Sequence, residues 1–216
     1  MNELDSELVR GQLAALGYQF VESPEGADVV LYNTCSVRDL AEQKVRSRLG
    51  EMAARKQRAP GLVVGVLGCM AERDGEDLIR RMPVVDLLCG PGELDKLPSL
   101  LDNAARTRES LLGGSNGSKD GRGRDLASAR QVALQGNTSR RSGTLAAAED
   151  NLELLDLSRS ISASDHGGSA YVRITRGCNK FCTYCVVPFT RGAEVHRPPD
   201  HIVEECRRLA DAGVIE

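Results

Sequence analysis

The sequence predicts an α/β protein whose N-terminal part is built from parallel βαβ units. Short apolar runs alternate with longer segments of helical periodicity, and glycine or proline follows several of those segments. The 41% share of hydrophobic residues is enough for a buried core. Strands that alternate with helices usually pair in parallel, with the helices as crossover connections.

The elements of residues 1–105 follow from this pattern in order. Four leucines at roughly helical spacing predict a first helix, and Gly17 ends it. These leucines are Leu4, Leu8, Leu13 and Leu16. The apolar runs then predict buried strands, and the segments between them predict helices. The expected strands are 27–32, 61–67 and 84–88, and the expected helices are 38–58, 74–82 and 93–105.

The composition changes in residues 113–150, which divides the chain. The glycine- and serine-rich run 113–124 has too few apolar residues to bury a core, so it predicts a flexible linker. A structureless stretch of this length is not expected inside one compact domain. The predicted organisation is therefore a first domain at 1–110, a linker at 111–165 and the start of a second domain at 166–216.

Residues 168–216 predict a strand at 170–175, a loop that contains cysteines, and a helix at 199–212. Gly213 is the expected C-cap of that helix. The next two residues, Val214 and Ile215, predict the start of another strand.

Three cysteines lie in the loop after residue 175, with the spacing C-x3-C-x2-C. They are Cys178, Cys182 and Cys185. Three thiolates on one short loop can hold three corners of a [4Fe–4S] cluster, which leaves the fourth iron open for a substrate or cofactor.

The cysteines have two other interpretations, a disulfide framework and a structural zinc site. A disulfide framework is disfavoured because seven cysteines are an odd number and the first twenty residues show no signal peptide, which predicts a cytoplasmic protein. A structural zinc site stays open, with Cys206, His196 or His201 as the fourth ligand. Cys206 is otherwise expected in the core, inside the last helix.

The net charge of −3 excludes a globally basic nucleic-acid-binding chain, so such binding would use a local patch or another module. No apolar stretch approaches membrane-spanning length, so no membrane partner is expected.

Four motifs in order carry a resemblance to a known family. The C-x3-C-x2-C loop, with an aromatic residue before the last cysteine, resembles the radical S-adenosylmethionine (SAM) enzymes. The stretch 177–198 is similar to the methylthiotransferases among them, and most similar to the MiaB-type branch that modifies tRNA. The other motifs are MNELDSE at 1–7, NTCSVR at 33–38 and GCMAER at 68–73.

The resemblance implies that Cys178, Cys182 and Cys185 hold a [4Fe–4S] cluster whose open iron binds SAM. One-electron cleavage of SAM would release a radical that abstracts hydrogen from C2 of an adenine. Tyr184 would lie near the adenine of SAM, or cover the cluster as a packing residue. The implied fold of 166–216 is the first βα unit of a radical SAM partial (βα)6 barrel. The implied partners are tRNA and a flavodoxin- or ferredoxin-like electron donor.

The resemblance also implies that Cys35 and Cys69 are ligands of a second [4Fe–4S] cluster, which takes part in sulfur insertion. Each follows an expected strand, and ligands bind at the carboxyl ends of parallel strands. In the family a cysteine precedes the position of Met1, so the second cluster is expected to be incomplete and the chain truncated at both ends. Cys89 is expected to be structural, with replacement of the missing ligand as the alternative.

The leading functional prediction is methylthiolation of C2 of N6-isopentenyladenosine near the anticodon of tRNA. One alternative is a sister methylthiotransferase that acts on threonylcarbamoyladenosine in tRNA or on an aspartate of a ribosomal protein. Another is a truncated, non-catalytic fragment that binds an iron–sulfur cluster or zinc. Arg191 and Arg197 are expected either to contact SAM or RNA phosphate or to form salt bridges, and the sequence favours neither.

Overall fold

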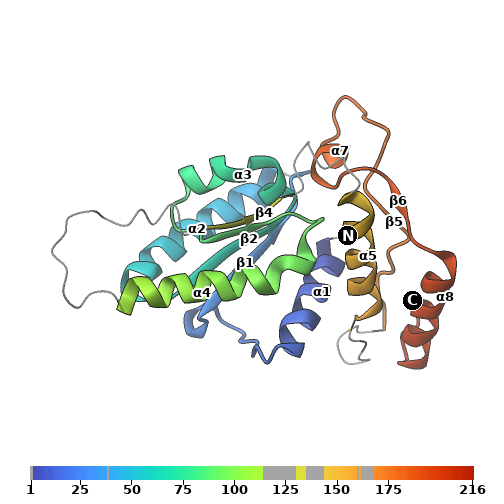
Figure 1. Cartoon of the computed structure of the whole chain (residues 1–216), viewed down its shortest axis with the longest axis horizontal. Helices are drawn as coiled ribbons and strands as arrows, with labels where there is room; N and C mark the ends of the chain where they lie inside the picture. Colours follow the sequence, from blue (N-terminus) through green and yellow to red (C-terminus); the bar gives the residue numbers. More distant parts are fainter. Residues whose placement is uncertain (1, 38, 114–129, 135–143, 160, 162–167) are drawn as a thin grey trace.

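The computed structural model describes residues 2–37, 39–113, 130–134, 144–159, 161 and 168–216. These residues form a four-stranded parallel sheet in the order β1-β2-β3-β4, with helices on both faces, and a separate two-stranded sheet (Figure 1). The α/β fold with a parallel N-terminal sheet is therefore confirmed. No helix in the described part of the chain is both long and apolar enough to cross a membrane.

The elements have the following bounds. The first part of the chain contains α1 (Asn2–Ala15), a 3-10 turn (Pro24–Gly26), β1 (Val29–Thr34), α2 (Asp39–Arg58), β2 (Val63–Gly68), α3 (Cys69–Arg81), β3 (Leu87–Cys89), a second 3-10 turn (Leu94–Lys96) and α4 (Leu97–Gly113). The later part contains β4 (Gln131–Ala133), α5 (Thr144–Leu157), β5 (Thr175–Arg176), α7 (Val187–Thr190), β6 (Val195–His196) and α8 (Pro199–Asp211).

Both faces of the sheet are covered, and each face has its own core. Alternate strand residues point to opposite faces. Val63 and Leu67 of β2 pack with leucines of α1, α4 and α5, whereas Val64 and Val66 pack with α2 and α3. Figure 1 shows α2 and α3 on one side of the sheet and α1 and α4 on the other. This burial on both faces explains why β2 reads as one continuous apolar run.

The helix expected at 74–82 begins earlier, at Cys69. Gly75 interrupts it with non-helical dihedrals, φ 51° and ψ −134°. The prediction was wrong about the start because the glycine produces a kink inside α3 rather than a boundary in front of it. The correction matters for function, because Cys69 is the first residue of the helix.

Two elements lie inside the segment 111–165, for which the sequence predicted a linker. β4 extends the sheet by pairing in parallel with β3, and α5 buries Leu152 and Leu155 against α1 and α4. A three-residue strand is too short to produce a sequence pattern, which explains why β4 was missed. The rest of the predicted linker, at 114–129, 135–143, 160 and 162–167, lies outside the described residues.

The C-terminal part differs from the expectation in its strands, because Val214 and Ile215 lie in no regular strand. Of the strand expected at 170–175, only Thr175 lies in a regular strand, β5, which pairs antiparallel with β6. The helix is confirmed as α8, and Gly213 follows it with φ 88°. Cys206 was expected in the core but is exposed on α8, so that prediction was wrong.

Candidate functional site

Cys35 and Cys69 lie at the same edge of the parallel sheet. In the register of β1 and β2, Thr34 pairs with Gly68, and each cysteine is the next residue along its strand. Cys35 is half-buried, whereas Cys69 is buried at the start of α3. The parallel register thus brings the two cysteine motifs together at the carboxyl ends of the strands.

Gly68 allows the sharp turn from β2 into α3. Its φ of 86° lies in the left-handed region that favours glycine. A Cβ at this position would lie 2.5 Å from Asn33 Oδ1 and 2.7 Å from the carbonyl oxygen of Thr34. Only a residue without a side chain therefore lets the end of β2, which Cys69 follows, lie so close to the end of β1.

The motif at residues 1–7 contributes to the same edge through α1. Asn33 Nδ2 donates a hydrogen bond of 2.8 Å to Ser6 Oγ, which connects α1 to the residue two positions before Cys35. The Val37 backbone N–H lies 3.4 Å from Cys35 Sγ. Three of the four motifs therefore meet at one edge of the sheet.

Arg191 connects this edge to the C-terminal part of the chain. It follows α7, and its Nη2 donates a hydrogen bond of 2.7 Å to Oδ2 of the buried Asp5. The helix α7 packs against α3, whose first residue is Cys69. Burial lowers the pKa of Arg191, but its interactions with Asp5 and Cys69 outweigh this effect, so the pKa is raised overall.

The loop with Cys178, Cys182 and Cys185 forms a hairpin whose two arms are held together by backbone contacts. The Cys178 N–H donates to the carbonyl oxygen of Gly192 at 3.2 Å. Gly177 has φ 65°, and a Cβ there would overlap the carbonyl oxygen of Ala193. Glycine at 177 is therefore required for the close approach of the two arms.

The thiols of this hairpin are accessible but are not drawn together. Cys178 and Cys185 are half-buried, Cys182 is exposed, and none forms a disulfide. Within the described residues, no three side chains of His, Cys, Asp or Glu form a group that could hold a metal ion. The donor set itself, three free thiols on one hairpin, has the chemistry that iron–sulfur clusters require.

Three aromatic residues belong to the same hairpin. Tyr184 is 91% exposed, so most of its ring is open to solvent. Phe181, which has a left-handed φ of 48°, packs edge-to-face against Phe189 with ring centroids 5.9 Å apart. The aromatic rings at this end of the molecule are therefore largely exposed on its surface.

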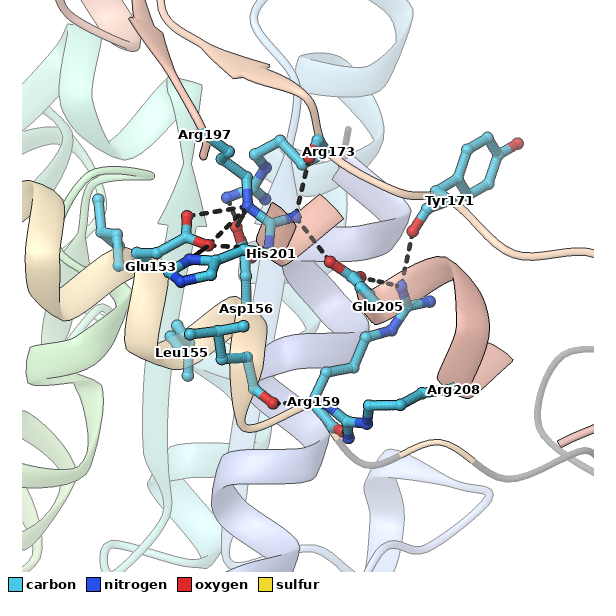
Figure 2. Close-up of polar contacts among 12 residues, drawn as sticks. Glu153, Leu155, Asp156, Arg159, Tyr171, Arg173, Arg197, His201, Glu205 and Arg208 are labelled. Carbon is cyan, nitrogen blue, oxygen red and sulfur yellow. Dashed lines mark hydrogen bonds and ion pairs between the residues drawn. The ribbon is translucent and has the colours of Figure 1, made fainter. Parts of the chain in front are cut away.

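A buried ionic network that the sequence did not predict fixes the base of the hairpin to α5 (Figure 2). Arg197, which follows β6, contacts Glu153 of α5 and donates a 2.6 Å hydrogen bond to Glu205 of α8. Arg176 forms an ion pair with Asp156 of α5. Arg191 and Arg197 each form salt bridges, which is one of the two roles expected for them. No local sequence signal marks these pairs, because the partners are far apart in the chain.

The remaining candidates take structural positions. Cys89 is fully buried among leucines, and its thiol lies 3.2 Å from the carbonyl oxygen of Glu93. Burial, reinforced by the charge of Glu93, raises the pKa of this thiol. Two residues considered as a fourth zinc ligand contact other side chains: His201 contacts Glu153, and His196 contacts Thr175.

Comparisons with known proteins match both cysteine-bearing parts of the chain. Residues 1–90 match the model of the uncharacterized protein family UPF0004, and residues 172–216 match the radical SAM superfamily. Over its whole length the chain is 40% identical to a tRNA-2-methylthio-N(6)-dimethylallyladenosine synthase of Rhodopirellula baltica, of which it covers 40%. It is 39% identical to a protein of the same name from Dichelobacter nodosus, with 40% of that protein covered. The chain thus spans about two fifths of the length of the curated relatives it matches.

Proposed function

We propose that this chain, which belongs to the MiaB-type radical SAM methylthiotransferase family, forms part of an enzyme. The proposed reaction is the methylthiolation of C2 of N6-isopentenyladenosine in tRNA. The relatives are named for the dimethylallyl form of this nucleoside. The substrate is therefore a tRNA, and the cofactors are SAM and iron–sulfur clusters. The electron donor in this proposal is a flavodoxin- or ferredoxin-like protein.

The observation that carries the proposal is the hydrogen bond of Arg191 to Asp5, together with the packing of α7 against α3, the helix that begins at Cys69. Arg191 ends the segment that contains the hairpin cysteines, and Cys69 lies at the edge of the parallel sheet. Methylthiolation needs hydrogen abstraction and sulfur insertion at one carbon, so the two cysteine sets have to serve one substrate. A direct contact between their supporting segments supports that arrangement.

We assign Cys178, Cys182 and Cys185 to the cluster that binds SAM. When bound, this cluster and SAM supply the one-electron chemistry that removes hydrogen from an unactivated carbon. The protein contributes a hairpin closed at Gly177, three free thiols and the exposed ring of Tyr184, which has an open face for the adenine of SAM.

Cys35 and Cys69 are assigned to the second cluster. Their position after paired residues of β1 and β2 supports a shared site. The burial of Cys89 among leucines supports a structural role for that residue rather than a replacement of the third ligand.

The beginning of a partial (βα)6 barrel is proposed for residues 168–216. The Glu216 N–H donates to the carbonyl oxygen of Gly168 at 3.0 Å, and the Ala170 N–H donates to that of Glu216 at 2.8 Å. This is the bonding pattern of two parallel strands on either side of a helix, here α8. The pattern supports a first βα unit whose second strand starts near residue 215.

Analysis of tRNA nucleosides tests the proposed substrate. In a strain that lacks the gene, the 2-methylthio derivative of N6-isopentenyladenosine should disappear and unmodified N6-isopentenyladenosine should accumulate. Persistence of the methylthio derivative would contradict the proposal, and loss of methylthio-threonylcarbamoyladenosine instead would indicate the sister activity.

Anaerobic reconstitution of the purified protein with iron and sulfide tests the assignment of the cysteines. Alanine variants of the three hairpin cysteines should each lose about four irons per chain, because each removes a ligand of the same cluster. An equal iron content in these variants and in the unaltered protein would refute the assignment.

A further inference from the structure

Asp5 is a buried carboxylate that contacts both arms of the cysteine hairpin. Its side chain is 2% exposed. Its Oδ1 accepts a hydrogen bond from Arg173, which precedes β5 on the first arm, and its Oδ2 accepts one from Arg191 on the second arm. The cysteine loop lies between these two arginines in the sequence. One aspartate of α1 thus joins the two ends of the segment 173–191.

The position of Asp5 also connects the hairpin to the other cysteine set. Its neighbour Ser6 accepts the hydrogen bond from Asn33, two residues before Cys35. Arg191 follows α7, which packs against α3, the helix that begins at Cys69. The dipeptide Asp5-Ser6 is therefore in contact with the supports of both candidate cluster sites.

The burial of Arg173 and Arg191 favours their pairing with Asp5. The side chain of Arg173 is 5% exposed and that of Arg191 is 11% exposed. A buried guanidinium without a carboxylate partner is strongly disfavoured. Asp5 pairs with Arg191, and it is the nearer of two carboxylates that pair with Arg173, the other being Asp156 at 3.5 Å. The same residue offers an oxygen to each arm, which fixes their separation as well as their position.

From these contacts we propose that Asp5 is a positioning residue, which holds the hairpin of Cys178, Cys182 and Cys185 at a fixed place relative to Cys35 and Cys69 through Arg173 and Arg191. The inference rests on the proposed function, because a fixed distance between the two cysteine sets matters only if both act on one substrate. Asp5 itself does not touch the reacting atoms. Its effect is on the efficiency with which SAM cleavage leads to sulfur insertion.

Hydrogen–deuterium exchange of the metal-free protein tests the structural half of the proposal. In Asp5→Asn, amides of residues 177–193 should exchange about tenfold faster, whereas those of β2 should be unchanged, because the hairpin loosens while the sheet stays folded. The matched control is Glu7→Gln, which removes another ion pair between α1 and the later part of the chain, with Arg159. Unchanged exchange in Asp5→Asn, or the same increase in Glu7→Gln, would overturn the proposal.

Product analysis of the iron-loaded, full-length enzyme tests the functional half. The ratio of methylthiolated nucleoside to 5′-deoxyadenosine should fall about tenfold in Asp5→Asn and stay constant in Glu7→Gln, because misplacement uncouples the two steps. A purely structural role would lower both products together and leave the ratio unchanged, which would refute the positioning role.

A second variant covers the case in which Asp5→Asn does not fold. Arg191→Gln removes one of the two contacts and leaves the pair of Asp5 with Arg173, and it should produce the same two changes. If the unaltered enzyme cleaved SAM but made no methylthiolated nucleoside, the proposed function would fail, and the exchange measurement would still decide the role of Asp5.

Discussion

Arg197 contacts both carboxylate oxygens of Glu153, with Nε 3.0 Å from Oε1 and 2.8 Å from Oε2, and Nη2 2.9 Å from Oε1. The Arg197 side chain is 2% exposed. Its Nη1 donates to Glu205 of α8 and to the carbonyl oxygen of Arg173. A single arginine therefore joins α5, α8 and the first arm of the cysteine hairpin, as Figure 2 shows.

We expect Glu153→Gln to destabilise the protein by about 2–3 kcal/mol, because it removes one of the three carboxylates that pair with the buried guanidinium of Arg197. Chemical denaturation at pH 7 measures this change. The control is Glu51→Gln, which breaks the exposed pair of Glu51 with Arg48 and should leave the stability nearly unchanged. Equal effects of the two substitutions would contradict a special role for the Arg197 contact.

The stability that Glu153 contributes should depend on pH. Burial raises its pKa, but the hydrogen bond and charge of Arg197 outweigh burial, so the pKa lies below its ordinary value of 4.5. A lowered carboxyl pKa stabilises the fold above the ordinary value, and this stability is lost as the pH falls through the folded value. The stability difference from Glu153→Gln should therefore be constant from pH 7 to about 5 and shrink below about pH 4. A difference that grew on acidification would refute this.

The pKa of Lys56 should lie well below that of an ordinary lysine. Burial lowers its pKa from 10.5 to about 8, although the hydrogen bond to Asp86 acts in the opposite direction. Asp86→Asn should lower the pKa further, because it removes the stabilising charge. The 15N shift of the Lys56 amine followed with pH measures both values, and a pKa near 10 in the unaltered protein would disprove the prediction.

The same lysine predicts a stability change in alkaline solution. Between the folded pKa of about 8 and the ordinary value of 10.5, the unfolded state binds more protons than the folded state. The stability of the protein should therefore rise with pH in this window, and the rise should be absent in Lys56→Met. Urea denaturation of both proteins at pH 8 and 10 makes the comparison.

Substitution by alanine should change the stability in opposite directions at Gly68 and at Gly50. Gly68→Ala places a Cβ against Asn33 and Thr34 at a positive φ, so it should destabilise the protein by about 2 kcal/mol or more. Gly50 lies inside α2 with nothing near its Cβ position, so Gly50→Ala should stabilise the protein by about 0.5–1 kcal/mol. Thermal denaturation of both variants tests the prediction, and a loss of stability in Gly50→Ala would contradict it.

Cys89→Ala should leave the iron content after reconstitution unchanged, because its thiol is buried and lies close to the carbonyl oxygen of Glu93. Cys69→Ala is the comparison and should lower the iron content. The cost of Cys89→Ala should appear as a modest loss of stability, about 1 kcal/mol, from the small cavity. A drop in iron content as large as that of Cys69→Ala would make Cys89 a ligand of the second cluster.

The sequence predicted the elements with strong periodicity and missed contacts between distant residues. β2 was found because both of its faces are apolar, and α8 because its apolar face and Gly213 mark its extent. The adjacency of Cys35 and Cys69 followed from the geometry of parallel strands. The contact of Asp5 with Arg191 could not be predicted, because 186 positions separate the partners and a charged residue carries no signal of burial.

The position of α5 decides where this chain can be divided. Glu153 and Asp156 supply the negative charge for Arg197 and Arg176, although they precede the region that matches the radical SAM superfamily. A piece that starts at residue 166 would leave Arg176 without its acidic partner and Arg197 with Glu205 alone, so it should be poorly soluble or unfolded. A piece that starts before Thr144 includes Glu153 and Asp156, which neutralise these arginines. In terms of charge, α5 therefore belongs with residues 172–216, although it precedes them.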